Sequence, residues 1–371
     1  CLDAVDGGAK AVNKDVYQES DGGKWVRYDE NGHMIKGENC QNGNWYYFEP
    51  VTGAMIHGPW TLPDGRKVYY DLTTGIMQYG NVSINGSLYY FDPVYGTMKS
   101  GALTNFWVTD GNGKSFWYES WVRQGWQPGS SNYRGKEIYD PASGAWYWLD
   151  NVQQGAKATS KEVYQDSNGG KWVRYDANGH MVKGEDCQNG KWYYFEPVTG
   201  AMIKGPWTLP DGRKVYYDPK TGIMQYGSVA VNNQLYYFDP VYGKMTSGTP
   251  GNFWYTIDGK SYWYENWVRQ GWQPSNANYR GKEIYDPASG AWYWLDSVQQ
   301  GAKAVSKEVY QDSNGGKWVR YDANGAMIKG WYAQDGKRWY YDLNTGAMYK
   351  GWSTIDGQTY HFDETTGVLI Q

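Results

Sequence analysis

A seven-residue frame of alternating side chains recurs along the chain. It begins with glycine and ends six residues later with Asp or Glu, as in residues 43–49. Positions are counted from this glycine, so that positions three and five, which are large and apolar or aromatic, are Tyr46 and Phe48 in this copy. A period of two residues is typical of a β-strand with one face on a core. We therefore expect positions three and five to face a core, and positions two and four to face more polar surroundings.

The frame occurs fifteen times. Its closing carboxylates are Asp29, Glu49, Asp71, Asp92, Glu119, Asp150, Asp176, Glu196, Asp218, Asp239, Glu265, Asp296, Asp322, Asp342 and Asp363. The residue that opens the frame is glycine in every copy except one, where it is Asn233. Because Asn is the non-glycine residue that best tolerates a left-handed backbone, the position requires a positive φ, as in a tight hairpin turn. The sequence therefore predicts about fifteen β-hairpins, with each frame as a second strand.

A longer period of about 147 residues encloses these short units. Residues 1–148 form the first long repeat, which is truncated at its start; residues 149–294 form the second, and residues 295–371 a partial third with more regular terminal hairpins. Cys1 falls in mid-repeat, which suggests a fragment of a longer array. All ten methionines occupy a Gly-x-Met position after the frame, so we expect a fixed structural role for Met.

Stacking of hairpins is required for stability. An isolated two-stranded hairpin is marginal in water, and ordering its residues costs about 1–2 kcal/mol each in backbone entropy. Neighbours that share an aromatic face can offset this cost. The fold class we predict is an all-β, elongated solenoid of stacked hairpins, without helices.

Composition narrows the classes of function. The chain has 371 residues, with 22 Trp, 37 Tyr and 49 Gly, and aromatic residues take over the burial that aliphatic residues usually provide. A net charge of −4 without basic runs argues against nucleic acid as a partner, and no apolar run approaches the roughly 20 residues needed for membrane insertion. Catalytic and metal-binding motifs are missing, and a carboxylate in every repeat favours hydrogen bonding at turns over catalysis. We expect no enzyme, no metal and no cofactor.

The repeat resembles a known family. Gly330-Trp331, the frame at residues 336–342, Thr345-Gly346-Ala347-Met348 and Gly351-Trp352 match choline-binding, or cell-wall-binding, repeats of Gram-positive surface proteins. Glucan-binding and clostridial toxin repeats are similar. The resemblance implies a left-handed superhelix in which a quaternary ammonium lies between neighbouring hairpins, inside a cage of about three aromatic rings. It also implies a secreted protein at the bacterial cell surface or cell wall.

Few hairpins keep all three rings of such a cage. The family pattern places one ring eleven residues before the carboxylate, one at frame position two, and one at position two of the next hairpin. Two complete triads follow from this pattern, Tyr139 with Trp146 and Trp172, and Tyr285 with Trp292 and Trp318. A bulge would allow a third site from Trp331, Trp339 and Tyr360. Structural packing between hairpins is the alternative interpretation of all nine rings.

Three functions remain open at this point. The first is a non-catalytic module that attaches a secreted protein to choline or a related cell-envelope component. The second is a carbohydrate-binding module for cell-wall polysaccharide, glucan or host glycan. The third is an adhesin or spacer that binds a host surface protein.

Overall fold

The chain is an all-β array of hairpins. The computed structural model describes residues 2–3, 9–19, 22–166, 169–312 and 315–370, so the prediction for Cys1 lies outside the described residues. Within these ranges the helical elements are two short 3-10 turns, η2 (Asn151–Gln153) and η4 (Ser297–Gln299). No helix among the described residues is long and apolar enough to cross a membrane.

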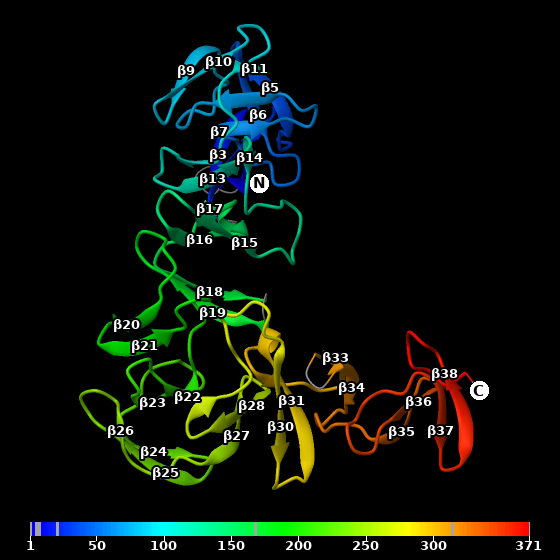
Figure 1. Ribbon diagram of the computed structural model, residues 1–371. Coiled ribbons are helices and arrows are strands. Elements are labelled where there is room, and N and C mark those ends of the chain that lie inside the picture. Colours follow the sequence, from blue (N-terminus) through cyan, green and yellow to red (C-terminus); the bar gives the residue numbers. More distant parts are fainter. Residues whose placement is uncertain (1, 4–8, 20–21, 167–168, 313–314, 371) are drawn as a thin grey trace. The chain divides into compact units, whose positions relative to one another are not determined.

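All fifteen frames form the second strand of an antiparallel hairpin, as predicted (Figure 1). In chain order, the strands up to residue 157 are β1 (Leu2–Asp3), β2 (Ala9–Lys10), β3 (Lys14–Gln18), β4 (Lys24–Tyr28), β5 (Gly37–Gln41), β6 (Asn44–Phe48), β7 (Gly58–Thr61), β8 (Lys67–Tyr70), β9 (Gly80–Ile84), β10 (Ser87–Phe91), β11 (Met98–Ser100), β12 (Phe106–Thr109), β13 (Ser115–Glu119), β14 (Val122–Arg123), β15 (Gly135–Asp140), β16 (Ala145–Asp150) and β17 (Ala156–Lys157). The same order then repeats in β18 (Lys161–Gln165), β19 (Lys171–Tyr175), β20 (Gly184–Gln188), β21 (Lys191–Phe195), β22 (Gly205–Thr208), β23 (Lys214–Tyr217), β24 (Gly227–Val231), β25 (Gln234–Phe238), β26 (Met245–Ser247), β27 (Asn252–Ile257), β28 (Lys260–Glu265), β29 (Val268–Arg269), β30 (Gly281–Asp286), β31 (Ala291–Asp296) and β32 (Ala302–Lys303). The last strands are β33 (Lys307–Gln311), β34 (Lys317–Tyr321), β35 (Gly330–Gln334), β36 (Lys337–Tyr341), β37 (Gly351–Ile355) and β38 (Gln358–Phe362).

The turn before each frame has the left-handed backbone that the sequence requires. Gly43 has a φ of 77°, and Asn233, the exception to glycine, has a φ of 64°. The preceding residues Asn42 and Asn232 also have positive φ values, so these are two-residue turns whose twist matches that of the paired strands.

Burial confirms part of the predicted alternation and corrects the rest. Val26 and Phe48, at positions three and five, are fully buried, and Trp45 at position two is exposed. Position four was expected on the more polar face, and this expectation is wrong for residues such as Tyr47 and Trp117, which are buried, but holds for Tyr90 and Tyr237, which are exposed. The reason is packing from a neighbouring element, since the Tyr47 ring lies 6.1 Å from the Trp60 ring of the next hairpin.

The methionine of each regular unit joins two hairpins. Met348 forms an isolated bridge with Tyr341 of its own hairpin, and its backbone N–H donates to the carbonyl of Trp318 in the preceding hairpin at 2.8 Å. The same bond runs from Met327 to the carbonyl of Trp292 at 2.8 Å. The fixed place of Met in the sequence therefore marks the joint between successive hairpins.

The two irregular regions form larger sheets. Strand β17 pairs with both β13 and β16 and merges two hairpins into a six-stranded sheet, and β32 does the same for the second copy. Trp121, which replaces the methionine there, has a φ of 76°, is fully buried, and donates from Nε1 to the carbonyl of Val68 at 3.1 Å.

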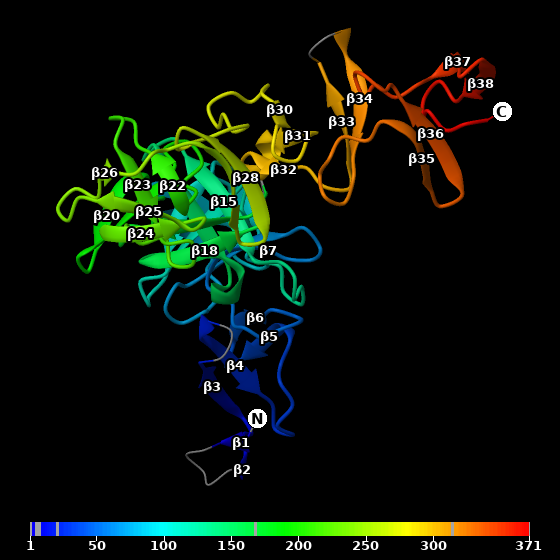
Figure 2. The ribbon, with the colours of Figure 1, turned by 90° about the horizontal axis from the view of Figure 1, so that it is seen from below.

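The chain divides into two compact units. Residues 1–162 with 174–181 form one, and residues 163–173 with 182–371 form the other. The last hairpins of the second unit, β33–β34, β35–β36 and β37–β38, are each two-stranded (Figure 2). Division into long repeats at residues 148 and 294 remains a prediction from the sequence period.

The closing carboxylates of the frame accept hydrogen bonds within the turn, as predicted, except Glu119 and Glu265, which pair with Lys136 and Lys282. One carboxylate oxygen of Asp342 accepts from the backbone N–H groups of Asn344 and Thr345 and from the Thr345 hydroxyl. The hydrogen bonds from Thr345 lower the pKa of Asp342, and those from Thr366 lower the pKa of Asp363 in the same way.

We expect Gly346→Ala to destabilise the chain more than Gly336→Ala. Both glycines have positive φ values, 69° and 73°, which cost an alanine about 1–2 kcal/mol. A Cβ at Gly346 would lie 2.4 Å from Sδ of Met327, whereas a Cβ at Gly336 meets nothing within 4 Å. The total loss at Gly346 should reach about 2–4 kcal/mol. Urea unfolding of both variants measures the difference, and equal losses would contradict a packing role for this glycine.

We also expect acid to unfold the array. A carboxyl group whose pKa is lower in the folded chain contributes stability above its unfolded pKa and loses it as the pH falls through the folded value. The ordinary pKa of Asp is 3.8, so the free energy of unfolding should fall below about that pH. Thermal melts between pH 6 and pH 2, followed by circular dichroism, test this; a melting temperature independent of pH would refute it.

Candidate ligand-binding sites

Five exposed Tyr–Trp pairs recur at equivalent places. In each, a tyrosine of the first strand lies directly opposite the tryptophan at frame position two. The ring centroids are 5.2–5.4 Å apart, with interplanar angles of 46–59°. The pairs are Tyr17–Trp25, Tyr139–Trp146, Tyr164–Trp172, Tyr285–Trp292 and Tyr310–Trp318. All ten side chains are 37–48 % exposed, so each pair offers apolar ring faces to a ligand.

A hydrogen bond to the next hairpin fixes the backbone of these tryptophans. The carbonyls of Trp292 and Trp318 each accept the hydrogen bond from a methionine of the next hairpin. Position two is therefore held by the solenoid joint while its side chain points outward. This arrangement fixes the backbone that carries each ring before any ligand binds, which limits the entropic cost of binding.

The predicted triad in the second unit is only partly assembled. Tyr285 and Trp292 lie together, with centroids 5.3 Å apart. Trp318 pairs instead with Tyr310, also at 5.3 Å, and no ring contact joins it to Trp292 in the described part of the unit. The participation of Trp318 in this triad therefore remains a prediction.

The other predicted triad spans the two compact units. Tyr139 and Trp146 form a pair in the first unit, with centroids 5.2 Å apart. Trp172 belongs to the second unit, where it pairs with Tyr164 at 5.4 Å. Its participation in a site with Tyr139 and Trp146 remains a prediction.

Four members of the exposed pairs were missed from the sequence: Tyr17, Trp25, Tyr164 and Tyr310. The search placed the first ring eleven residues before the closing carboxylate, as at Tyr139. Tyr164 stands twelve residues before Asp176, because its hairpin has a different turn length. A search for any Tyr opposite a position-two Trp would have found all five pairs.

The predicted site at Trp331, Trp339 and Tyr360 is wrong in one member. The register of β35 and β36 is regular, with Trp331 opposite Tyr340 and no bulge. Trp339, the next residue along the strand, therefore faces the other side of the hairpin, where it lies opposite Tyr332. Trp331 and Tyr360 do come together, with centroids 5.0 Å apart.

An internal cation already occupies the Trp331 ring. The guanidinium of Arg338 lies 4.4 Å from the ring centroid, in the position where a bound cation would make the same interaction. Trp331 is thus a less open site than the five Tyr–Trp pairs.

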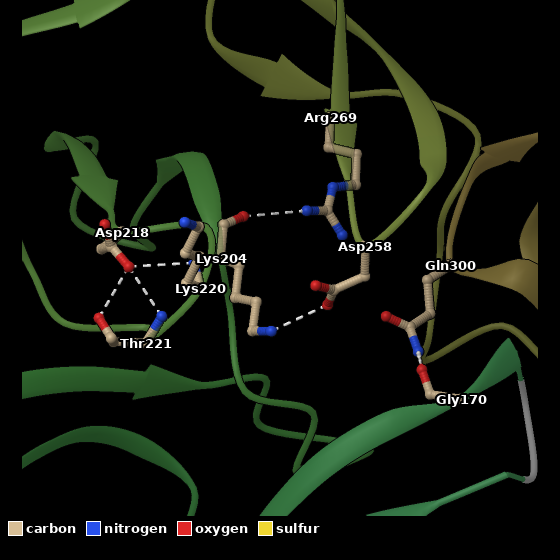
Figure 3. Close-up of polar contacts among 8 residues, drawn as sticks. All are labelled: Gly170, Lys204, Asp218, Lys220, Thr221, Asp258, Arg269 and Gln300. Atoms are coloured by element: carbon tan, nitrogen blue, oxygen red, sulfur yellow. Dashed lines mark hydrogen bonds and ion pairs between the residues drawn. The ribbon is translucent and has the colours of Figure 1, made fainter.

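A second type of aromatic cluster is completely built around an arginine. The guanidinium of Arg269 lies 4.4 Å from the ring of Tyr262, and three more rings lie 5.5–5.8 Å away, those of Trp207, Tyr264 and Trp272. Its Nε donates to the Tyr264 hydroxyl at 3.0 Å, and Nη2 donates to the carbonyl of Lys204 at 3.2 Å (Figure 3). These rings hold a structural cation, which the sequence did not reveal.

Equivalent cavities adjoin two of the exposed pairs. A cavity of about 540 Å³ is bounded by Tyr285 and Trp292, and one of about 520 Å³ by Tyr139 and Trp146. The lining of the former includes the carboxylates Glu265, Glu283 and Asp286 but only one cation, Lys282, which pairs with Glu265 at 3.1 Å. The cavity therefore combines aromatic faces with an excess of negative charge.

No metal-binding cluster of side chains accompanies these cavities among the described residues. There, no group of three or more His, Cys, Asp or Glu side chains is placed to hold a metal ion. Cys40 and Cys187 are both exposed thiols.

Comparison with known proteins identifies the repeat. A family model described as a choline-binding repeat matches residues 18–60, 165–207 and 311–350. The chain is 25% identical to glucosyltransferase-S of Streptococcus mutans over 210 residues, which cover 56% of the chain and 13% of that protein. It is 27% identical to glucosyltransferase-I of Streptococcus downei over 344 residues, which cover 85% of the chain and 20% of that protein. The chain thus spans a fifth or less of the length of these curated relatives.

Comparison with solved structures also found a match. It is the choline-binding protein F of Streptococcus pneumoniae, which is 18% identical, with a TM-score of 0.34, over 96% of this chain and 98% of that chain.

We expect the arginine cluster to act in stability. Arg123 repeats the cluster in the first unit: its guanidinium lies 4.3 Å from the Phe116 ring, and it donates to the Tyr118 hydroxyl and the His57 carbonyl. Arg123→Ala should lower the free energy of unfolding by about 2–3 kcal/mol, through lost cation–π contacts and unpaired acceptors. Arg338→Ala, which removes a cation from one ring contact, should cost under about 1 kcal/mol. Similar urea midpoints for the two variants would contradict a structural role for Arg123.

Proposed function

The chain carries repeats of the choline-binding family in three segments, and from this premise we propose that it is a non-catalytic surface-attachment module. It binds choline, or a related cationic component of the bacterial cell envelope, and so holds a secreted protein at the cell surface. The observation that carries this proposal is the acidic cavity beside an exposed Tyr–Trp pair, present once in each of the two compact units.

The chemistry of this cavity suits a quaternary ammonium. Such a cation forms no strong hydrogen bonds, so it is recognised by ring faces and by nearby negative charge. Tyr285 and Trp292 supply the faces, while Glu283 and Asp286 lie in the same lining without a second lysine to balance them. Two modest sites on one chain, presented to a polymer with many ligands, increase overall avidity.

Carbohydrate binding is the second candidate. It is favoured by the glucosyltransferase relatives, one of which matches over 85% of the chain. Exposed Tyr and Trp rings can also stack on the apolar face of a sugar ring. The excess of carboxylates in the two cavities favours a cation over a neutral sugar, so we rank glucan binding second, and binding to a host surface protein third.

Isothermal titration distinguishes these candidates. We expect two choline molecules to bind per chain, and Trp146→Ala to remove one of them, because it truncates one pair. Trp352→Ala is the matched control: Trp352 is 65% exposed, stacks on His361 and belongs to none of the five pairs. Its choline stoichiometry should equal that of the unaltered chain.

The same titration includes glucose oligomers. Heat with these oligomers and none with choline would replace the attachment proposal by glucan binding. Absence of heat with both ligand classes would leave the host protein as the candidate.

A further inference from the structure

A basic cavity lies beside the Tyr164–Trp172 pair in the second unit. Its volume is about 310 Å³, and its lining combines these two rings with residues from the β18–β19 turn, the β27–β28 turn and the segment before β22. Four of the lining side chains are cations, Lys171, Lys204, Lys260 and Arg269, whereas the one carboxylate is Asp258. Cations therefore outnumber carboxylates in this lining, whereas carboxylates outnumber cations in the acidic cavities.

The single carboxylate does not neutralise the cavity. Asp258 pairs with Lys204 at 2.8 Å, but the Asp258 side chain is 63% exposed and the Lys204 side chain only 10%. One carboxylate offsets one cation, so Lys260 and Arg269 have no carboxylate in the lining to balance them.

Lys260 and Arg269 are held by neutral oxygen atoms. Lys260 donates to Oε1 of Gln299 at 2.9 Å and to the carbonyl of Gly169, while Arg269 donates to the carbonyl of Lys204 and the Tyr264 hydroxyl. Figure 3 shows Lys204, Asp258 and Arg269 converging from separate loops and strands. Gln300 lies on the far side, where it donates to the carbonyl of Gly170 at 2.9 Å. These bonds fix the positions of Lys260 and Arg269 through neutral acceptors.

The equivalent cavity in the first unit is different. It keeps the Tyr17–Trp25 pair, but His57 takes the place of Lys204 and the volume is about 40 Å³. Burial, and then the charge of Arg123, lower the pKa of His57, so its imidazole is neutral at pH 7. The second copy has thus gained both room and charge at one position.

We propose that the second-unit cavity binds an oxyanion, a carboxylate or phosphate group, carried on a sugar or polyol that lies against Trp172 and Tyr164. Fixed cations in a partly enclosed site attract an anion strongly, and Lys and Arg donate well to carboxylate and phosphate oxygens. The adjacent rings provide an apolar face for the attached carbon skeleton. This site goes beyond the proposed attachment function and uses none of the residues of the acidic cavities.

The test titrates the full chain with inorganic phosphate and, separately, with glucuronate and glucose in low salt. We expect saturable binding of an anion at one site, weakened by added sodium chloride because the attraction is electrostatic. Tighter binding of glucuronate than of phosphate identifies a carboxylate on a sugar as the preferred source; the reverse identifies phosphate. Glucose should bind at least tenfold more weakly than glucuronate.

Substitutions then locate the site. Lys204→Met and Lys260→Met should each weaken anion binding at least tenfold, and melting curves establish that both variants fold. Lys220→Met is the matched control, because Lys220 is an exposed lysine of the same unit outside the cavity lining. No saturable binding, or an equal loss in the Lys220 variant, would overturn the proposal.

Titration with choline distinguishes failure of the oxyanion site from failure of the proposed attachment function. Lys204→Met should retain the choline stoichiometry, since the acidic cavities are unchanged. A chain that binds the anion but not choline would refute the attachment proposal alone, and the opposite result would refute the oxyanion site alone.

Discussion

Two antiparallel strands of five residues bury too little surface to remain folded in water, and this constraint governs the chain. Each hairpin must share its buried face with a neighbour. Position four of the frame shows how completely this happens: Tyr47 is buried against the next hairpin although the strand pattern predicts a half-exposed face. The aromatic residues are therefore first of all the core of the array, and only those left at its surface are available to ligands.

The chain's own cations reduce that number further. Arg123 and Arg269 each fill a cluster of aromatic rings, and Arg338 covers Trp331. A ring that stacks on an internal guanidinium cannot bind an external cation on the same face. The two proposed binding places differ in the charges that line their cavities, mostly carboxylates beside Trp292 and mostly cations beside Trp172, although the ring pairs have nearly the same geometry.

Local features of the fold could be predicted from the sequence, because they depend on single residues. Asn233 in place of glycine revealed the positive φ of the turn, and the turn role of Asp342 followed from its presence in every repeat. Contacts between hairpins could not be predicted in this way. Arg123 reaches the carbonyl of His57, which is 66 residues away, and Trp339 faces away from Trp331 because of the strand register. The Tyr–Trp pairs were found only in part, since a one-residue difference in the turn displaces the tyrosine.

The hydrogen bond between a methionine amide and a tryptophan carbonyl also has a mechanical meaning. At Trp292 the same residue presents its ring to solvent and its carbonyl to Met327 of the following hairpin. Tension on a molecule held by that ring passes through the tryptophan backbone into a neighbouring hairpin, and is not confined to a flexible loop. Force is thereby distributed over two neighbouring hairpins at every such ring.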